Sequence, residues 1–131
     1  MPITVQWFDA EHTLIKVDYE GRWTWDEFFA AADDGRALAK SVNHRVDYIL
    51  DMRNGVIPRS GSTLTNSRTV MAKRAPNSGI FVTLTTPFVK TMLNVFKNFD
   101  REHGSIMYAA GTPEEAIALI SKHRQKDKAK V

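Results

Sequence analysis

Residues 46–62 read VDYILDMRNGVIPRSGS, and this stretch decides the fold that the sequence predicts. Its first five residues are apolar except for Asp47, which is typical of a strand buried on both faces, as in a parallel sheet. Asn54-Gly55 and Pro58 are expected to end regular structure, and residues 60–62 offer a start for a helix. The stretch therefore predicts a strand, a loop and a helix N-terminus, which is a common place for α/β sheets to bind ligands.

Strands and helices alternate on both sides of this stretch. Upstream, apolar alternation in 3–8 and 14–19 predicts two strands, and the short turn between them predicts an antiparallel hairpin. Downstream, the signals predict a helix within 61–75, a strand at 80–84, a helix from Thr86-Pro87, a strand at 105–109 and a helix from Thr112-Pro113. The predicted class is α/β: a single domain with a mostly parallel five-stranded sheet and about four helices, in which one strand precedes four strand-helix units.

Thr24-Trp25-Asp26-Glu27 carries the clearest local signal in the chain. Thr24 is expected to cap the backbone N–H of Glu27 while the Glu27 carboxylate reaches back to the Thr24 N–H, which is a capping box. Trp23 and Phe28 occupy the two positions of a hydrophobic staple. A helix should therefore begin here and run to about Lys40.

The helix expected within 61–75 has an unfavourable composition. Hydroxyl and amide side chains fill its first turns, and these residue types are poor helix formers. Leu64, Arg68, Met71 and Ala75 share one face of the predicted helix. We therefore expect a helix that depends on tertiary contacts and has a mobile first turn.

Length and composition are those of a single globular domain. The chain has 131 residues, enough to bury a core, and it contains no cysteine. It has no apolar run of 18 residues and no signal-peptide pattern at its start, so we expect a cytoplasmic protein that does not span a membrane. The domain is expected to cover 1–124. Residues 125–131 form a basic tail at the end of a segment, 122–131, that is expected to fray.

The net charge of +3 is distributed unevenly along the chain. Residues 1–51 contain ten acids and five bases, for a net charge of −5. Residues 52–99 contain seven bases and no acid, for +7, and residues 100–131 contain five acids and six bases, for +1. The basic middle begins at the predicted junction, which favours an acidic partner or an anionic ligand there.

No motif for catalysis or cofactor binding is found. The chain lacks the nucleophile elbow, the glycine-rich phosphate loops and a metal-ligand spacing of histidines. We therefore expect no enzymatic activity, no cofactor and no metal. Trp7, Trp23 and Trp25 could stack on bases, but their positions favour packing. The basic residues do not interleave with aromatic ones, so no nucleic-acid partner is expected.

The junction after the third strand holds the candidate binding residues. Asp51 serves either a functional site or the backbone of the loop. Arg53, Arg59 and Arg68 either converge on an anion at the helix N-terminus or are solvated. Ser60 is a candidate phosphorylation site, although a serine here also suits a helix cap. The predicted ligand- or partner-binding residues are Asp51, Arg53, Asn54, Arg59, Ser60, Ser62 and Arg68.

The element order, the run Gly21-Arg22-Trp23-Thr24-Trp25-Asp26-Glu27 and the strand exit Ile49-Leu50-Asp51-Met52 together resemble the STAS, or SpoIIAA-like, domain family. The resemblance covers about residues 3–124. In anti-sigma factor antagonists of this family, the loop ends in Asp-Ser-Ser-Gly, and a partner kinase phosphorylates the first serine. Ser60 falls on that serine, within Arg59-Ser60-Gly61-Ser62.

The resemblance implies a non-enzymatic interaction or regulatory module that acts through the Arg53–Ser62 loop and the following helix on an acidic protein partner. The alternative is a carrier of a small anionic or amphiphilic, lipid-like ligand, because some SpoIIAA-like proteins resemble the Sec14 group in architecture. In that case the apolar helix predicted over 88–99, with Phe88, Met92, Val95, Phe96 and Phe99 on one face, would cover a pocket. A homodimer is compatible with either function.

Overall fold

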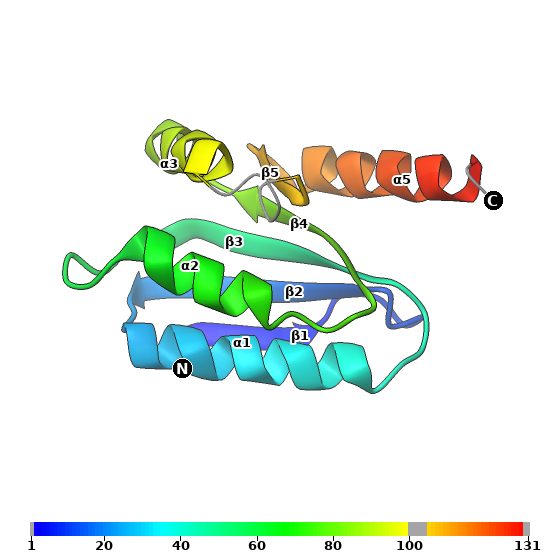
Figure 1. Cartoon of the computed structure of the whole chain (residues 1–131), viewed down its shortest axis with the longest axis horizontal. Coiled ribbons are helices and arrows are strands. Elements are labelled where there is room, and N and C mark those ends of the chain that lie inside the picture. The colour runs from blue at the N-terminus through cyan, green and yellow to red at the C-terminus, as the bar shows by residue number, and fades with distance from the viewer. Residues whose placement is uncertain (1, 100–104, 130–131) are drawn as a thin grey trace.

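Helices cover both faces of a twisted five-stranded sheet in the computed structural model of the chain, which describes residues 2–99 and 105–129 (Figure 1). The elements along the described chain are β1 (Ile3–Trp7), β2 (Leu14–Arg22), α1 (Trp25–Lys40), β3 (Val46–Val56), α2 (Thr63–Ala72), β4 (Ser78–Leu84), α3 (Pro87–Phe99), β5 (Met107–Ala110) and α5 (Pro113–Ala129). This order confirms the predicted α/β class and the alternation of strands with helices.

The sheet is mixed, with the strands in the order β1-β2-β3-β4-β5. β1 pairs with β2 in the antiparallel direction, since only a short turn joins them. The remaining three pairs are parallel, and each parallel pair is connected through a helix. The predicted hairpin and the mostly parallel sheet are therefore confirmed.

The prediction that Asn54-Gly55 ends the third strand is wrong. β3 continues to Val56, and residues 54–56 pair with residues 20–22 of β2. A Cβ at Gly55 would lie 3.0 Å from Trp23 Nε1 and 3.0 Å from Tyr19 Cβ. The glycine therefore marks a close approach inside a strand and not a turn. As a result, the loop between β3 and α2 comprises only residues 57–62.

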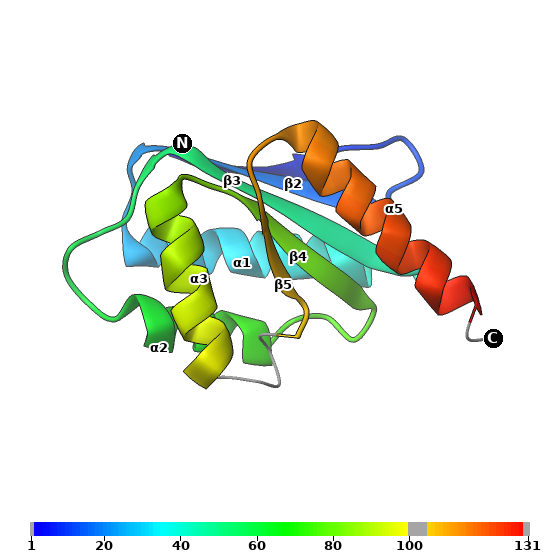
Figure 2. The same ribbon diagram turned by 90° about the horizontal axis from the view of Figure 1, so that it is seen from above.

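The two faces of the sheet belong to different parts of the core, as side-chain alternation along β3 shows. Tyr48 and Leu50 pack in the cluster that includes α1 and α2, whereas Ile49 packs in the cluster that includes α5. Figure 1 shows α1 and α2 on one side of the sheet and α5 on the other. Seen from above in Figure 2, α5 crosses the sheet with its C-terminal end near the start of β3.

The predicted capping box starts α1. Thr24 Oγ1 accepts a hydrogen bond from Glu27 N at 3.2 Å, and Glu27 Oε1 accepts one from Thr24 N at 3.0 Å. The rings of Trp23 and Phe28 stack with their centroids 5.8 Å apart, in agreement with the predicted staple. The helix ends at Lys40, as expected.

Gly35→Ala is expected to raise the free energy of unfolding by about 0.5–1 kcal/mol. Gly35 lies in the interior of α1, where alanine has the better helix propensity. A Cβ there would meet only Val5 Cγ1 within 4 Å, at an ordinary contact distance of 4.0 Å. Urea unfolding of the two proteins measures the difference. A destabilised variant would show that α1 has no room for the methyl group.

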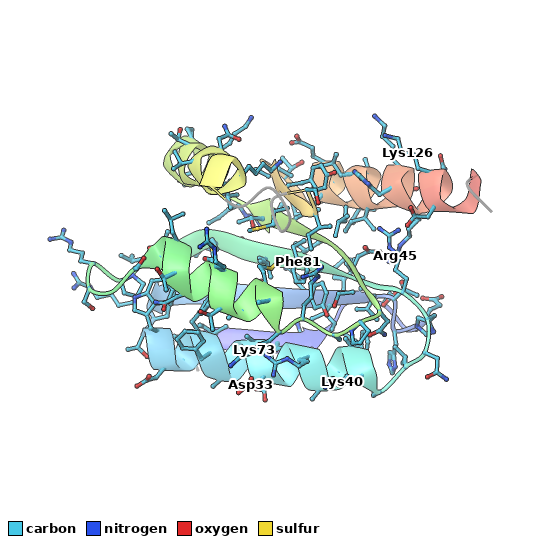
Figure 3. The ribbon with its side chains drawn as sticks, in the orientation of Figure 1. Asp33, Lys40, Arg45, Lys73, Phe81 and Lys126 are labelled. Carbon is cyan, nitrogen blue, oxygen red and sulfur yellow. The ribbon has the colours of Figure 1, made fainter. Side chains whose placement is uncertain are left out.

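A cluster of charged side chains around the buried Asp47 connects α5 to the start of β3. Asp47 is fully buried, and its carboxylate accepts hydrogen bonds from Ile80 N at 2.8 Å, Arg45 Nε at 3.0 Å and Arg124 Nε at 2.7 Å. Arg45 also pairs with Asp127, close to the end of α5. Figure 3 shows Arg45 between the sheet and this helix. The Asp47 carboxylate therefore joins the residue before β3, a backbone N–H of β4 and an arginine of α5.

The expectation that 122–131 frays is wrong for residues 122–129. α5 continues to Ala129, because Arg124 and Asp127 anchor its second half to the sheet. The last two residues of the predicted tail, 130–131, lie outside the described residues. Most of the apolar face predicted for α3 also lies outside the described side chains, which in this helix exclude Phe88, Val89, Met92, Phe96, Asn98 and Phe99. In α5 the side chains of Lys128 and Ala129 are likewise not described. Val95 of that face is exposed, while Leu93 packs against the cluster under α1 and α2.

Candidate ligand-binding cavity

An apolar cavity of about 130 Å³ lies between the sheet and the helices α1 and α2. Its floor consists of the side chains that four strands direct toward these helices. They are Val17 and Tyr19 of β2, Tyr48, Leu50 and Met52 of β3, Phe81 and Thr83 of β4, and Met107 of β5. Every second residue of β3 thus contributes to the floor, as strand alternation requires.

The roof of the cavity leaves its space unfilled because α2 is a polar helix. Met71 is the only buried residue of α2. On the side of the helix that lines the cavity, Thr63 and Ser67 stand where a well-packed core helix would carry large apolar side chains. Leu64 also lines the cavity and is still 38% exposed. A hollow therefore remains between α2 and the sheet.

Aromatic side chains dominate the lining, and six of them contribute to it: Tyr19, Trp23, Trp25, Phe28, Tyr48 and Phe81. Their rings contact one another in pairs. Trp23 and Trp25 are 5.1 Å apart at their centroids, and Tyr48 and Phe81 stack at 4.2 Å with nearly parallel planes. Such surfaces favour planar, apolar ligand groups.

Among the described residues, two arginines supply the formal charge of the lining, and no described Asp or Glu lines the cavity. Arg36 Nε donates to Lys73 O at 2.7 Å, and Arg36 also pairs with the exposed Asp33 at 2.8 Å. Arg74 donates to Met71 O at 2.8 Å. In Figure 3, Asp33 and Lys73 lie where α1 and α2 face each other. A guanidinium has five N–H donors, so both arginines keep donors for an anion.

Two hydroxyl groups line the cavity without a protein partner. Their residues are largely buried, since Tyr19 is 5% exposed and Thr83 is 2% exposed. No hydrogen bond joins either hydroxyl to another residue in the described part of the chain. Burial raises the pKa of Tyr19, so its hydroxyl stays protonated and available as a donor. Among the described residues, the fully buried side-chain polar atom that lacks a partner is Trp23 Nε1, and Trp23 also lines the cavity.

The loop at 57–62 closes one end of the cavity. Trp25 Nε1 donates to Ser60 O at 2.7 Å, and both Trp25 and Ile57 line the cavity. Gly61 has a φ of +78°, a conformation that favours glycine, and a Cβ there would lie 3.0 Å from Trp25 Nε1. The loop is therefore fixed to the first turn of α1 by a hydrogen bond and a close packing contact.

Asp51 and Arg53 form an ion pair on the opposite face of the sheet. The Arg53 guanidinium donates to Asp51 Oδ1 at 3.0 Å and to Oδ2 at 2.9 Å, and Lys16 lies 4.0 Å from the same carboxylate. Both residues alternate with Leu50 and Met52 of the cavity floor, so they face away from it. Arg53 is therefore a residue of β3 that pairs with Asp51. Its side chain does not lie on the face of the sheet that α2 covers, where the anion site was predicted.

The other predicted residues lie nearer to α2 but do not form one cluster. Arg59 and Ser60 are exposed in the loop, and Ser62 is the N-cap of α2, where its hydroxyl accepts from Thr65 N at 3.1 Å. Asn54 is exposed in β3. Arg68 is exposed on α2, and its neighbour Ser67 lines the cavity.

Replacement of Asp51 by asparagine is expected to cost more stability at pH 6 than at pH 3. Hydrogen bonds from Arg53 lower the pKa of Asp51 below its ordinary value of 3.8, although burial opposes them. A carboxylate with a lowered folded pKa contributes stability above its unfolded pKa and loses it as the pH falls through the folded value. Urea unfolding at pH 6 and pH 3 measures the change, with the exposed Asp34→Asn as control. A wild-type advantage that is equal at both pH values would contradict the prediction.

The sequence analysis missed the cavity, although a signal for it exists. It assigned Trp23 and Trp25 to packing, and it did not single out Tyr19, Thr83, Arg36 or Arg74. The signal is the pattern of α2, where Thr63 and Ser67 stand among the apolar Leu64, Val70 and Met71 on the side that lines the cavity. A helix with small polar residues on its inward face cannot fill the space beneath it.

Neither a metal centre nor a membrane span is found in the described parts of the chain. Within residues 2–99 and 105–129, no three acidic or histidine side chains come together in a way that could hold a metal ion. None of the described helices has both the length and the hydropathy that crossing a membrane requires.

A scan of the chain against models of known protein families gave no match, and a search of curated proteins gave none either.

Proposed function

We propose that this protein is a carrier of a small anionic amphiphile, which binds in the cavity between the sheet and helices α1 and α2. The observation that carries the proposal is an apolar, aromatic-lined cavity in which the charged side chains, as far as the chain is described, are two arginines and no acid. A mostly apolar pocket with a few polar groups is the usual form of a small-molecule site. The fold is proposed to be SpoIIAA-like, which is supported by the sequential strand order and the antiparallel first pair.

Octanoate is a suitable first probe because it joins a carboxylate to a short apolar chain. Trp23 and Trp25 line the cavity, so their fluorescence should change as the ligand enters. A Trp7→Phe background removes the third tryptophan, which stacks on His12 away from the cavity. Titration of the full chain is expected to give a saturable change in emission.

Ser67→Phe is expected to abolish the saturable change, since a phenyl ring on the inward face of α2 would occupy the cavity. Ser121→Phe is the matched control, because Ser121 is exposed on α5, which packs on the other face of the sheet. Both variants should keep the circular dichroism spectrum of the parent. Saturable binding that survives Ser67→Phe would place the ligand elsewhere and refute the proposal.

A second candidate function is the interaction module that the sequence predicts. It is favoured by the exposure of Arg59 and Ser60 in the loop at 57–62, within a stretch of residues, 52–99, that has no acid. Phosphorylation of Ser60 would add roughly −1.5 to −2 charges next to Arg59. Arg59→Glu is expected to remove an acidic partner that co-purifies with the protein, whereas Lys122→Glu, an exposed position on α5 on the other face of the sheet, should keep it. Equal recovery of the partner with both variants would exclude the loop as its binding surface.

A further inference from the structure

The size of the cavity restricts the ligand to a small molecule. Its volume of about 130 Å³ is close to that of engineered apolar cavities of about 150 Å³, which take up one benzene molecule. A single ring with short substituents fits such a space, whereas a long acyl chain does not. This argument rests on the proposed function and narrows the class of ligand.

The aromatic lining favours a ring over an aliphatic chain of similar size. The stacked rings of Tyr48 and Phe81 form part of the floor, and Trp23, Trp25 and Phe28 contribute from the end where α1 begins. Offset-stacked and edge-to-face contacts with these rings stabilise an aromatic ligand beyond the burial of its area.

The two arginines lie toward one end of the cavity and Tyr19 toward the other, with Thr83 between them. α1 runs back from the end of β2 to the start of β3, so Arg36, near the end of α1, lies toward the start of β3 (Figure 1). Arg74 follows the end of α2, at the same end of the helix layer. Tyr19 lies in the second half of β2, near the start of α1, and Thr83 lies between, in the row of Val17 and Leu50. A ligand that bonded both ends would need an anionic group and a separate hydrogen-bonding group.

We infer that the cavity binds a small aromatic carboxylate that carries a second hydrogen-bonding group on the far side of its ring. The carboxylate would bind Arg36 and Arg74, the ring would lie over Tyr48 and Phe81, and the far group would bond the free hydroxyl of Tyr19. The ligand class is thus a ring of benzene size with a short acidic side chain and a polar substituent opposite to it.

Four probes test this inference by removing ligand features. 4-Hydroxyphenylacetate has all three features, phenylacetate lacks the hydroxyl, 4-(2-hydroxyethyl)phenol lacks the carboxylate, and octanoate lacks both the ring and the hydroxyl. Titration calorimetry of the full chain is expected to show the tightest binding for 4-hydroxyphenylacetate. Loss of the hydroxyl should weaken binding by roughly three- to ten-fold and loss of the carboxylate by about ten-fold or more.

Variants of the protein test which residue binds the hydroxyl of the ligand and which binds its carboxylate. Tyr19→Phe is expected to weaken 4-hydroxyphenylacetate but not phenylacetate, while Tyr108→Phe, which alters a hydroxyl bonded to Ser105 O outside the cavity, should change neither. Arg74→Met should weaken both acids but not the neutral phenol, and Arg22→Met on β2 is its control. Thermal unfolding confirms that each variant is folded before it is titrated.

The outcomes separate this inference from the proposed function. If octanoate binds and no aromatic acid does, the aromatic class is wrong and the proposed function stands. If none of the four probes binds, both fail. Equal affinities of 4-hydroxyphenylacetate and phenylacetate would overturn the role given to Tyr19.

Discussion

Asp47→Ala is expected to lower the free energy of unfolding by about 3–5 kcal/mol, because it leaves two arginines without their buried partner. Asp47 is fully buried, and its two carboxylate oxygens accept from Arg45, Arg124 and the backbone N–H of Ile80. Without the carboxylate, the arginines must remain partly desolvated and unpaired or move out to water. In the second case α5 loses its attachment to the start of β3, and the end of the helix should fray.

Urea unfolding followed by circular dichroism measures the loss, and hydrogen exchange over 120–129 reports whether α5 frays. Asp33→Ala is the matched control, since it removes a carboxylate that also pairs with an arginine but is 68% exposed. Exposed pairs contribute about 0–1 kcal/mol, so the control should change little. If Asp47→Ala cost as little as the control, Asp47 would not be what holds α5 on the sheet.

Local sequence signals predicted most of the fold. The capping box at Thr24 depends on residues three positions apart, and the hairpin before it depends on one short turn, so neighbouring residues suffice to predict both. Gly55 shows where this approach fails. In the sequence Asn54-Gly55 is a turn signal, but Trp23 and Tyr19 pack against this glycine from another strand, and that contact is invisible until the chain is folded.

The candidate site was predicted less well than the fold, for two physical reasons. Arg53 was grouped with Arg59 and Arg68 because the three residues lie close together in the sequence. However, β3 pairs with β2 beyond the predicted end of the strand, so Arg53 belongs to β3. Strand alternation then directs its side chain to the far face of the sheet, where it pairs with Asp51. The cavity results from what α2 lacks, since Ser67 and Thr63 leave space above the sheet. Unfilled space is a property of facing elements, so a single stretch of sequence signals it only weakly.

Gly79→Ala is expected to lower the free energy of unfolding by about 3 kcal/mol, since the added methyl group would collide with the Asp47 cluster. A Cβ at Gly79 would lie 2.9 Å from Arg45 Cζ and still closer to Asp47 Oδ1 and Arg45 Nε. Those atoms belong to a buried hydrogen-bond network, and moving them breaks the bond between the Asp47 carboxylate and Ile80 N. Gly111→Ala is the control, because a Cβ there would meet only Glu115 Oε2, at 3.6 Å.

A double-mutant cycle shows whether the cost of Gly79→Ala comes from Asp47. In the Asp47→Ala protein the carboxylate is gone and no longer holds Arg45 beside Gly79, so the arginine can move aside and the second substitution should cost much less than it does alone. The two changes are in contact, and their free energies of unfolding should therefore fail to add by about 2 kcal/mol. Urea unfolding of the four proteins gives this coupling. Additive losses would mean that Gly79 is needed for a reason other than the space the Asp47 carboxylate occupies.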